Sequence, residues 1–147
     1  SFDKNVPFVR ELADRCASLA DNRGYIRTLG GRKRHFNLWE KREFENCTNA
    51  LPRHLAEKAW PGEQLRRAGS RKALNALIQG SAADMTKRAI IEIYKQEKLV
   101  PILQVHDELD LAVDTEAQMT RCKKIMEGVF KLRVPIIAEV EIGAHWK

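Results

Sequence analysis

The apolar and polar positions along the chain predict a mixture of helices and short strands. Some stretches carry apolar residues at the three- and four-residue spacing of an amphipathic helix, and shorter runs alternate or cluster as strands do. The predicted helices span about residues 5–23, 70–98 and 115–131, and the predicted strands span 25–28, 34–36, 101–105, 109–113 and 136–142. This pattern predicts an α+β fold, in which a small antiparallel sheet is backed by helices.

Local signals mark the ends of several of these elements. Asn5 precedes the first helix, and Asn22-Arg23-Gly24 stops it. Ser70 and Thr115 stand where the N-caps of the other two helices are expected. Leu29-Gly30-Gly31 separates the first two strands and predicts a β-hairpin.

Residues 37–69 carry no clear period. They mix charged side chains with Trp39, Phe44 and Trp60, and prolines and glycines interrupt them, so we expect short helices and loops. The aromatic side chains could stack on nucleic-acid bases, but core or interface packing is the simpler expectation.

Composition limits the class of protein. The chain has 147 residues, 44% of them apolar and 31% charged, which fits one domain with a real core. No apolar run approaches the roughly 18 residues of a membrane span, and nothing at the start is typical of a signal peptide. Three widely spaced cysteines predict neither a disulfide framework nor a structural zinc, so we expect a reducing, cytoplasmic setting. Because there is no initiator Met, we expect a processed chain or part of a longer one.

The net charge of +6 is concentrated in the middle of the chain. Residues 21–72 hold thirteen basic and six acidic side chains, and the rest is nearly balanced. Such a basic segment is typical of a surface that binds a polyanion, although a solvated arginine-rich surface would show the same count.

The most informative segment is Gln104-Val105-His106-Asp107-Glu108-Leu109. Two short β-runs meet there with only a His, an Asp and a Glu between their apolar residues, which places two carboxylates at a hairpin tip. An acidic turn in solvent would explain this composition. A rigid acidic tip would also suit Mg²⁺, which binds one or two carboxylates and completes its shell with water and phosphate. Since neighbouring strand residues point to opposite faces, one of Asp107 and Glu108 would be the main ligand and the other would support it.

This segment resembles motif C of family A DNA polymerases, the bacterial DNA polymerase I type and its phage relatives. Three other segments resemble the same family in the same order. They are 24–34, which is similar to the segment before the basic hairpin, 71–84, which is similar to the long palm helix before motif C, and 134–146, which is similar to the C-terminal strand and tail. The resemblance therefore covers most of the chain, and the long stretch 39–68 is more similar to the phage members.

The resemblance implies that residues 1–147 form the C-terminal part of a polymerase palm domain. The fold it implies has a long helix before a catalytic hairpin. Motif A, which carries the first catalytic Asp, and motif B on the fingers helix have no counterpart here, nor do the thumb and the exonuclease. The implied function is DNA synthesis from dNTP on a primer–template, with two Mg²⁺ ions. We expect a site completed by an upstream polypeptide carrying motifs A and B, in the cytoplasm of a bacterial or phage-infected cell, and no activity of this chain alone.

The resemblance also implies roles for the residues around the tip. Asp107 would be one of the two main metal ligands and Glu108 a weaker one. His106 would touch the primer terminus, although a structural histidine would fit the sequence equally well. Arg32, Lys33 and Arg34 would contact backbone phosphates without reading the sequence.

Arg71, Asn75 and Gln79 follow at intervals of four, so they share one helix face. Their donors would suit the minor groove, where every base pair presents acceptors at similar positions. We expect this face to check base-pair geometry, and a polar solvent-facing stripe is the plainer alternative.

Two other interpretations stay open. His106-Asp107 could be the metal dyad of an HD-type phosphohydrolase, although His35 and His54 are predicted outside the helices that such a site needs. The chain could also be a non-catalytic, basic nucleic-acid-binding subunit whose carboxylates only form a turn. Metal-dependent primer extension would separate the polymerase from the binding subunit.

Overall fold

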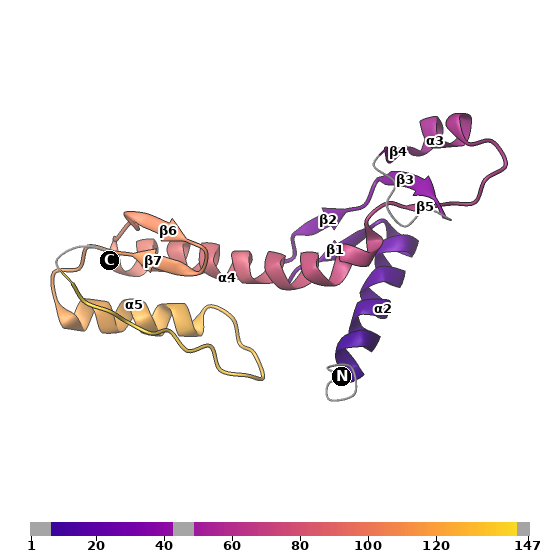
Figure 1. Cartoon of the computed structure of the whole chain (residues 1–147). Coiled ribbons are helices and arrows are strands. Elements are labelled where there is room, and N and C mark those ends of the chain that lie inside the picture. The colour runs from indigo at the N-terminus through magenta and orange to yellow at the C-terminus, as the bar shows by residue number, and fades with distance from the viewer. Residues whose placement is uncertain (1–6, 43–48, 144–147) are drawn as a thin grey trace. The chain divides into compact units, whose positions relative to one another are not determined.

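A computed structural model of the chain describes residues 7–42 and 49–143 (Figure 1). The chain divides into two compact units, Ser1–Gly80 and Ser81–Lys147. Helices combined with small antiparallel sheets confirm the α+β prediction, but the described strands form three separate sheets rather than one.

The first unit begins with helix α2 (Pro7–Arg23), which ends where the sequence predicts. The residue after it, Gly24, has φ +76°, a left-handed conformation that glycine adopts without steric cost. Its N–H donates to the carbonyl of Ala20 at 2.9 Å, which closes the last turn. The predicted start at Asn5 lies outside the described residues.

The predicted first hairpin is present. Strands β1 (Tyr25–Arg27) and β2 (Lys33–His35) pair antiparallel, with Arg27 opposite Lys33 across a five-residue turn. Ile26 and Phe36 are buried, and they join Cys16 and Ala20 of α2 in the core of this unit. The base of the hairpin is therefore held by apolar packing, while its cationic side chains stay at the surface.

A second sheet occupies the stretch where the sequence predicts only short helices and loops. Strand β3 (Leu38–Lys41) lies between β4 (Leu51–Pro52) and β5 (Leu65–Arg67), and helix α3 (Arg53–Ala59) separates the two outer strands in the chain. The prediction missed this sheet because its strands are two to four residues long and charged, so no alternation of polarity is visible.

Charged and aromatic side chains stabilise this second sheet. Arg66 of β5 donates to the carboxylate of Glu40 on β3 at 2.9 Å, and their residues lie opposite one another in the register. The half-buried Trp39 lies between the guanidinium groups of Arg53 and Arg67, at 5.1 and 4.7 Å from its ring centroid. Trp39 therefore packs inside the sheet, as expected for the aromatic residues of this segment, and Phe44 lies outside the described residues.

The long helix α4 (Ala73–Glu97) follows a 3₁₀ turn, Ser70–Lys72. The prediction that Ser70 caps this helix is wrong. Gly69, with φ +73°, precedes the 3₁₀ turn and makes no side-chain cap, whereas Ser70 is the first residue of that turn and lies three residues before α4 begins. Among the described residues, no helix is long and apolar enough to span a membrane.

The second unit contains the end of α4, strands β6 (Leu103–Val105) and β7 (Glu108–Asp110), and helix α5 (Glu116–Gly128). The predicted hairpin is confirmed, with shorter strands than the sequence suggests. Thr115 caps α5 as predicted, because its hydroxyl accepts from the N–H of Gln118 at 3.2 Å. Ile93 of α4 and Cys122 of α5 are buried, and burial raises the pKa of the Cys122 thiol.

The last predicted strand, 136–142, is not formed. Residues 131–143 have no regular secondary structure, and no described strand pairs with them. The segment is fixed to α5 at one point, where the N–H of Ala138 donates to Glu127 at 3.1 Å. β-Propensity alone therefore does not make a strand, because a strand forms only when its backbone groups pair with those of a neighbouring strand.

Candidate nucleic-acid and metal site

The carboxylates that the sequence singles out lie at a two-residue turn. Val105 pairs with Glu108, so His106 and Asp107 alone connect β6 to β7. His106 has φ +52°, which is rare for a residue with a side chain, and such positions cluster at functional sites. The signs of φ in this turn match a type II′ hairpin, whose first residue is usually glycine.

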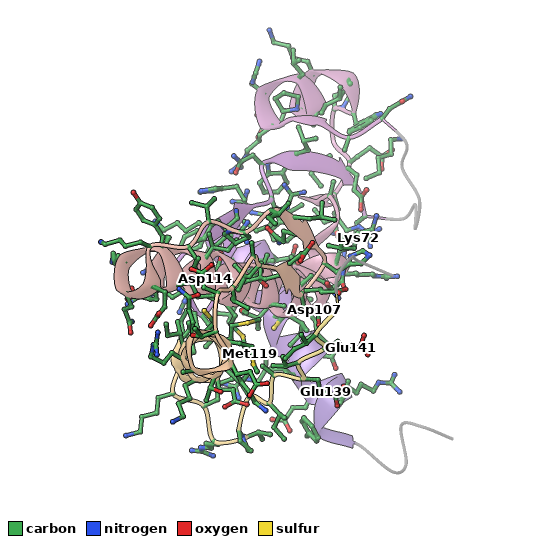
Figure 2. The ribbon with its side chains drawn as sticks, turned by 90° about the vertical axis from the view of Figure 1, so that its left-hand side faces the viewer. Lys72, Asp107, Asp114, Met119, Glu139 and Glu141 are labelled. Atoms are coloured by element: carbon green, nitrogen blue, oxygen red, sulfur yellow. The ribbon has the colours of Figure 1, made fainter. Side chains whose placement is uncertain are left out.

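The turn presents both acidic side chains to solvent. Asp107 and Glu108 are exposed, and Asp107 is labelled at this hairpin in Figure 2. The amide of Gln104 donates to the carbonyl of His106 at 3.1 Å and so braces the turn. Two adjacent, exposed carboxylates on a braced turn offer the hard oxygen ligands that Mg²⁺ prefers. Among the described residues, no group of three or more His, Cys, Asp or Glu side chains lies close enough together to hold a metal ion.

The basic hairpin β1–β2 carries its cations outward. Lys33 and Arg34 are exposed, and Lys33 lies over the ring of Tyr25, with its Nζ 4.7 Å from the centroid. The guanidinium of Arg34 lies 6.0 Å from the ring centroid of Phe36. In both contacts the charged group itself lies near an aromatic ring, and both side chains stay exposed and so remain accessible to an anion.

Arg32 has a structural contact that the sequence did not indicate. Its guanidinium Nη2 donates to the carbonyl of Gly80 on α4 at 3.0 Å, and its backbone N–H donates to the hydroxyl of Thr28 at 3.1 Å. A Cβ on Gly80 would lie 2.7 Å from the Thr28 methyl carbon, so only glycine lets the hairpin turn approach the helix this closely. A glycine in the middle of a predicted helix was the available signal for this approach.

The structure divides the basic middle of the chain into two kinds of surface. Within 38–68 the charges nearly balance, and ion pairs join Lys41 to Glu63, Arg53 to Glu57 and Arg66 to Glu40. The excess of cations therefore belongs to the hairpin and to the 3₁₀ turn. The cations of those two elements are Arg27, Arg32, Lys33, Arg34, Arg71 and Lys72, and Arg23 at the end of α2 adds one more.

Arg71, Asn75 and Gln79 all have exposed side chains, as a shared helix face requires. Arg71 lies in the 3₁₀ turn, while Asn75 and Gln79 lie in the first turns of α4. These residues belong to the first unit, and the carboxylate hairpin belongs to the second.

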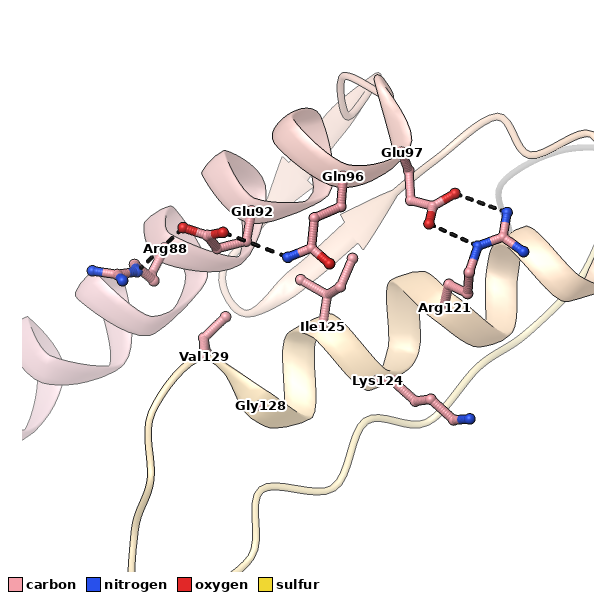
Figure 3. Close-up of a pocket in the computed structure, with 9 residues that line it drawn as sticks. All are labelled: Arg88, Glu92, Gln96, Glu97, Arg121, Lys124, Ile125, Gly128 and Val129. Atoms are coloured by element: carbon pink, nitrogen blue, oxygen red, sulfur yellow. Dashed lines mark hydrogen bonds and ion pairs between the residues drawn. The ribbon is translucent and has the colours of Figure 1, made fainter.

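A cleft of about 550 Å³ lies in the second unit, between the end of α4 and α5 (Figure 3). Arg121 crosses it and donates twice to Glu97, at 2.7 and 2.9 Å. This hydrogen-bonded pair lowers the pKa of Glu97 and raises that of Arg121. The two parallel hydrogen bonds connect the end of α4 to α5.

The family model for DNA polymerase family A matches residues 1–147. The chain is 33% identical over 146 residues to the DNA-directed DNA polymerase of Pseudomonas phage M6, a match that covers 99% of this chain and 18% of that protein. It is 32% identical over 149 residues to the thermostable DNA polymerase I of Thermus aquaticus, covering 97% of this chain and 16% of that protein. Among solved structures, the Pol1 polymerase domain from M. smegmatis, in complex with DNA primer-template and dNTP, matches with a TM-score of 0.58 and 30% identity over 86% of this chain and 20% of that one.

The chain therefore belongs to DNA polymerase family A, which confirms the resemblance in its motifs. It spans less than a fifth of the length of the curated relatives described above. The comparisons identify the family of the whole chain, and the roles of individual residues stay predictions.

Proposed function

We propose that this chain supplies the motif C side of a DNA polymerase active site, in the C-terminal part of a palm domain. The reaction would be nucleotidyl transfer from a dNTP to a primer 3′-OH. The observation that carries the proposal is the two-residue turn that presents Asp107 and Glu108 on a braced hairpin, within a chain of this family. Membership of the family supports DNA synthesis, and the exposed, braced turn supports the proposal that Asp107 and Glu108 take part in it.

Asp107 would hold Mg²⁺ directly and Glu108 would support it. Bound Mg²⁺ would stabilise the charge that develops on the attacking and leaving oxygens. His106, held next to Asp107 by the turn, would lie against the primer terminus. The turn contributes positioning, because its two-residue loop and left-handed residue would fix the backbone at Asp107 before DNA binds.

The exposed cations of the basic hairpin would hold the DNA. Lys33 and Arg34 would contact backbone phosphates, and Arg32 would do so with the part of its guanidinium not bonded to Gly80. The face formed by Arg71, Asn75 and Gln79 would lie in the minor groove at the primer end, where its donors meet acceptors present on every base pair.

The upstream part of the polymerase would cover the second unit. Ile102 and Leu103, at the start of the hairpin, are 70% and 41% exposed, and Val134 and Ile137 near the C-terminus are 73% and 75% exposed. A two-stranded sheet has two open edges, and such edges together with exposed apolar side chains favour a partner strand. We propose that a polypeptide carrying motifs A and B binds here and adds the second main carboxylate.

The test is primer extension by the purified chain, alone and after addition of a polypeptide carrying motifs A and B. The chain alone should incorporate no nucleotide at any Mg²⁺ concentration, and the mixture should extend the primer as the template directs. Asp114→Asn serves as the matched control for the Asp107→Asn variant, because Asp114 is also an exposed carboxylate of the second unit and lies outside the turn. Template-dependent extension by the chain alone would disprove the divided site.

The alternative, a non-catalytic nucleic-acid-binding subunit, keeps the basic hairpin and gives the carboxylates no chemical role. It predicts salt-sensitive DNA binding with no extension in any mixture. DNA binding by the chain together with no extension in any mixture, with or without the Asp107→Asn change, would favour this alternative.

A further inference from the structure

The β1–β2 hairpin is too small to hold its shape alone. Each strand has three residues, and a two-stranded hairpin of this length is marginal in water. Its turn is fixed to α4 through Arg32 and Gly80. The base of the hairpin, where Gly24 and Phe36 meet, is the other place at which its direction is set, because the N–H of Phe36 donates to the carbonyl of Gly24 there at 2.8 Å.

Arg67 of strand β5 reaches this base. Its Nε donates to the carbonyl of Asp21 in the last turn of α2, and its Nη1 donates to the carbonyl of Phe36, both at 2.9 Å. The first of these is one of the helix-end carbonyls that lack a partner within the helix, and a positive charge is favoured there. One guanidinium thus joins the end of α2 to the end of β2.

Two further contacts fix the plane of this guanidinium. On one side it lies 4.7 Å from the ring centroid of Trp39. It also approaches Gly24 so closely that a Cβ there would lie 3.0 Å from the Arg67 Cζ. A planar group with two directed donors and a stacked face fits this space, and a lysine ammonium would reproduce neither feature.

We propose that Arg67 is a positioning residue for nucleic-acid binding by the basic hairpin. Through Arg67, the sheet β4–β3–β5 holds the base of the hairpin so that Lys33 and Arg34 present their charges in a fixed direction. The other cations of the sheet are paired, Arg66 with Glu40 and Lys41 with Glu63, so the sheet acts on the nucleic acid through this one guanidinium rather than by adding cations. This inference rests on the phosphate-binding role given above to the hairpin.

The test compares Arg67→Lys with Arg66→Lys, two changes on one strand that both keep the net charge. Arg66 points to Glu40 instead of the hairpin, so its change serves as the matched control. Binding of a fluorescent primer–template duplex by the purified chain is measured by anisotropy between 50 and 200 mM salt. Arg67→Lys should weaken binding about tenfold and make the salt slope shallower by about 1, the loss expected for one phosphate contact. Arg66→Lys should change neither value.

A second background separates positioning from a general loss of structure. In the Lys33→Ala, Arg34→Ala double variant the hairpin no longer carries these phosphate contacts, so adding Arg67→Lys should weaken binding less than about twofold. An equal loss in both backgrounds would overturn the inference, as would an unchanged salt slope in a folded Arg67→Lys protein. If Arg67→Lys does not fold, Trp39→Leu removes the stacking contact and keeps both hydrogen bonds. It should weaken binding in the same direction, again only when Lys33 and Arg34 are present, and a loss that persists without them would overturn the inference.

The same measurements distinguish this inference from the proposed function. If the double variant binds DNA as the wild type does, the hairpin does not contact phosphates, and the role of Arg67 is rejected with it. If the double variant binds weakly and Arg67→Lys binds normally, only the role of Arg67 is rejected. The chemistry proposed for Asp107 is tested separately by primer extension.

Discussion

The chain contains two antiparallel hairpins with opposite charge, and their surroundings differ as much as their charge does. The β1–β2 hairpin has a five-residue turn and buries Ile26 within its strands and Phe36 next to them. The β6–β7 hairpin has a two-residue turn, and none of the residues in its strands is buried.

This difference separates two ways of presenting a charged group. The basic hairpin is held by packing and by side chains of its own unit, so its cations have fixed positions without any partner. The acidic hairpin fixes its tip by a short turn and leaves its strand edges open. A phosphate contact tolerates small displacements, whereas a metal ligand must be placed within a fraction of an ångström, so the acidic hairpin needs a covering partner more than the basic one does.

The largest expected effect is at the acidic tip. Asp107→Asn should lower primer extension by the assembled enzyme at least about 100-fold, because it removes a direct metal ligand. DNA affinity should stay close to that of the wild type, and Glu108→Gln should cost less activity. Steady-state extension together with duplex anisotropy checks both values, and equal activity in Asp107→Asn and wild type would remove the metal assignment.

The next effect concerns the polar face at the start of α4, which shares the unit of the basic hairpin. Gln79→Ala should lower extension by the equivalent of about 1–3 kcal/mol and change the extension of terminal mismatches, because it removes a hydrogen bond to the minor groove. No preference for particular bases should appear. A change that affects only salt-dependent affinity would instead place Gln79 among the phosphate contacts.

The base of the basic hairpin should be sensitive to a single methyl group. Gly24→Ala combines a left-handed φ with a contact at 3.0 Å to Arg67, and it should lower the free energy of unfolding by about 2–3 kcal/mol. Gly62→Ala, with φ +80° and nothing within 4 Å, should cost only about 1 kcal/mol. Urea denaturation measures both, and equal losses would show that the contact with Arg67 contributes nothing.

Lys98, which precedes the acidic hairpin in the chain, has a strained backbone conformation that a glycine would relieve. Lys98 follows α4 with φ +60°, and its N–H donates to the carbonyl of Tyr94 at 3.0 Å. Lys98→Gly should stabilise the protein by about 0.5 kcal/mol, since glycine adopts this conformation without steric cost. Lys95→Gly, inside the last turn of α4, should instead destabilise it by about 1 kcal/mol. Thermal unfolding of the two variants gives the comparison.

The smallest effect is a pH dependence in the second unit. The bonded Arg121 lowers the pKa of Glu97 in the folded state, so the pair adds stability above the usual glutamate pKa of about 4.3 and loses it as the pH falls through the lower, folded value. Below about pH 4.3, the melting temperature of the wild type should therefore fall more steeply than that of Glu97→Gln. Parallel melting curves across that range would show that the pair does not contribute.

The sequence alone determined the elements whose signals are local. Helix α2 ends at Gly24 because only glycine adopts its φ readily, and α5 starts after Thr115 because a hydroxyl there caps the first turn. The tip of the acidic hairpin could also be predicted, since only three polar residues separate two apolar runs there. The family followed from ordered motifs, which are properties of the sequence.

Only the tertiary structure decided what depends on residues far apart in the chain. In the sheet β4–β3–β5, Trp39 pairs with Arg67 and Glu40 pairs with Arg66, although these residues come from opposite ends of the segment. No local sequence pattern predicts this pairing. Ser70 is buried in the folded protein, although its position in the sequence suits the N-cap of a helix. The stretch 136–142 has the composition of a strand but pairs with no described strand, because strand pairing depends on the arrangement of the rest of the chain and not on the composition of the stretch itself.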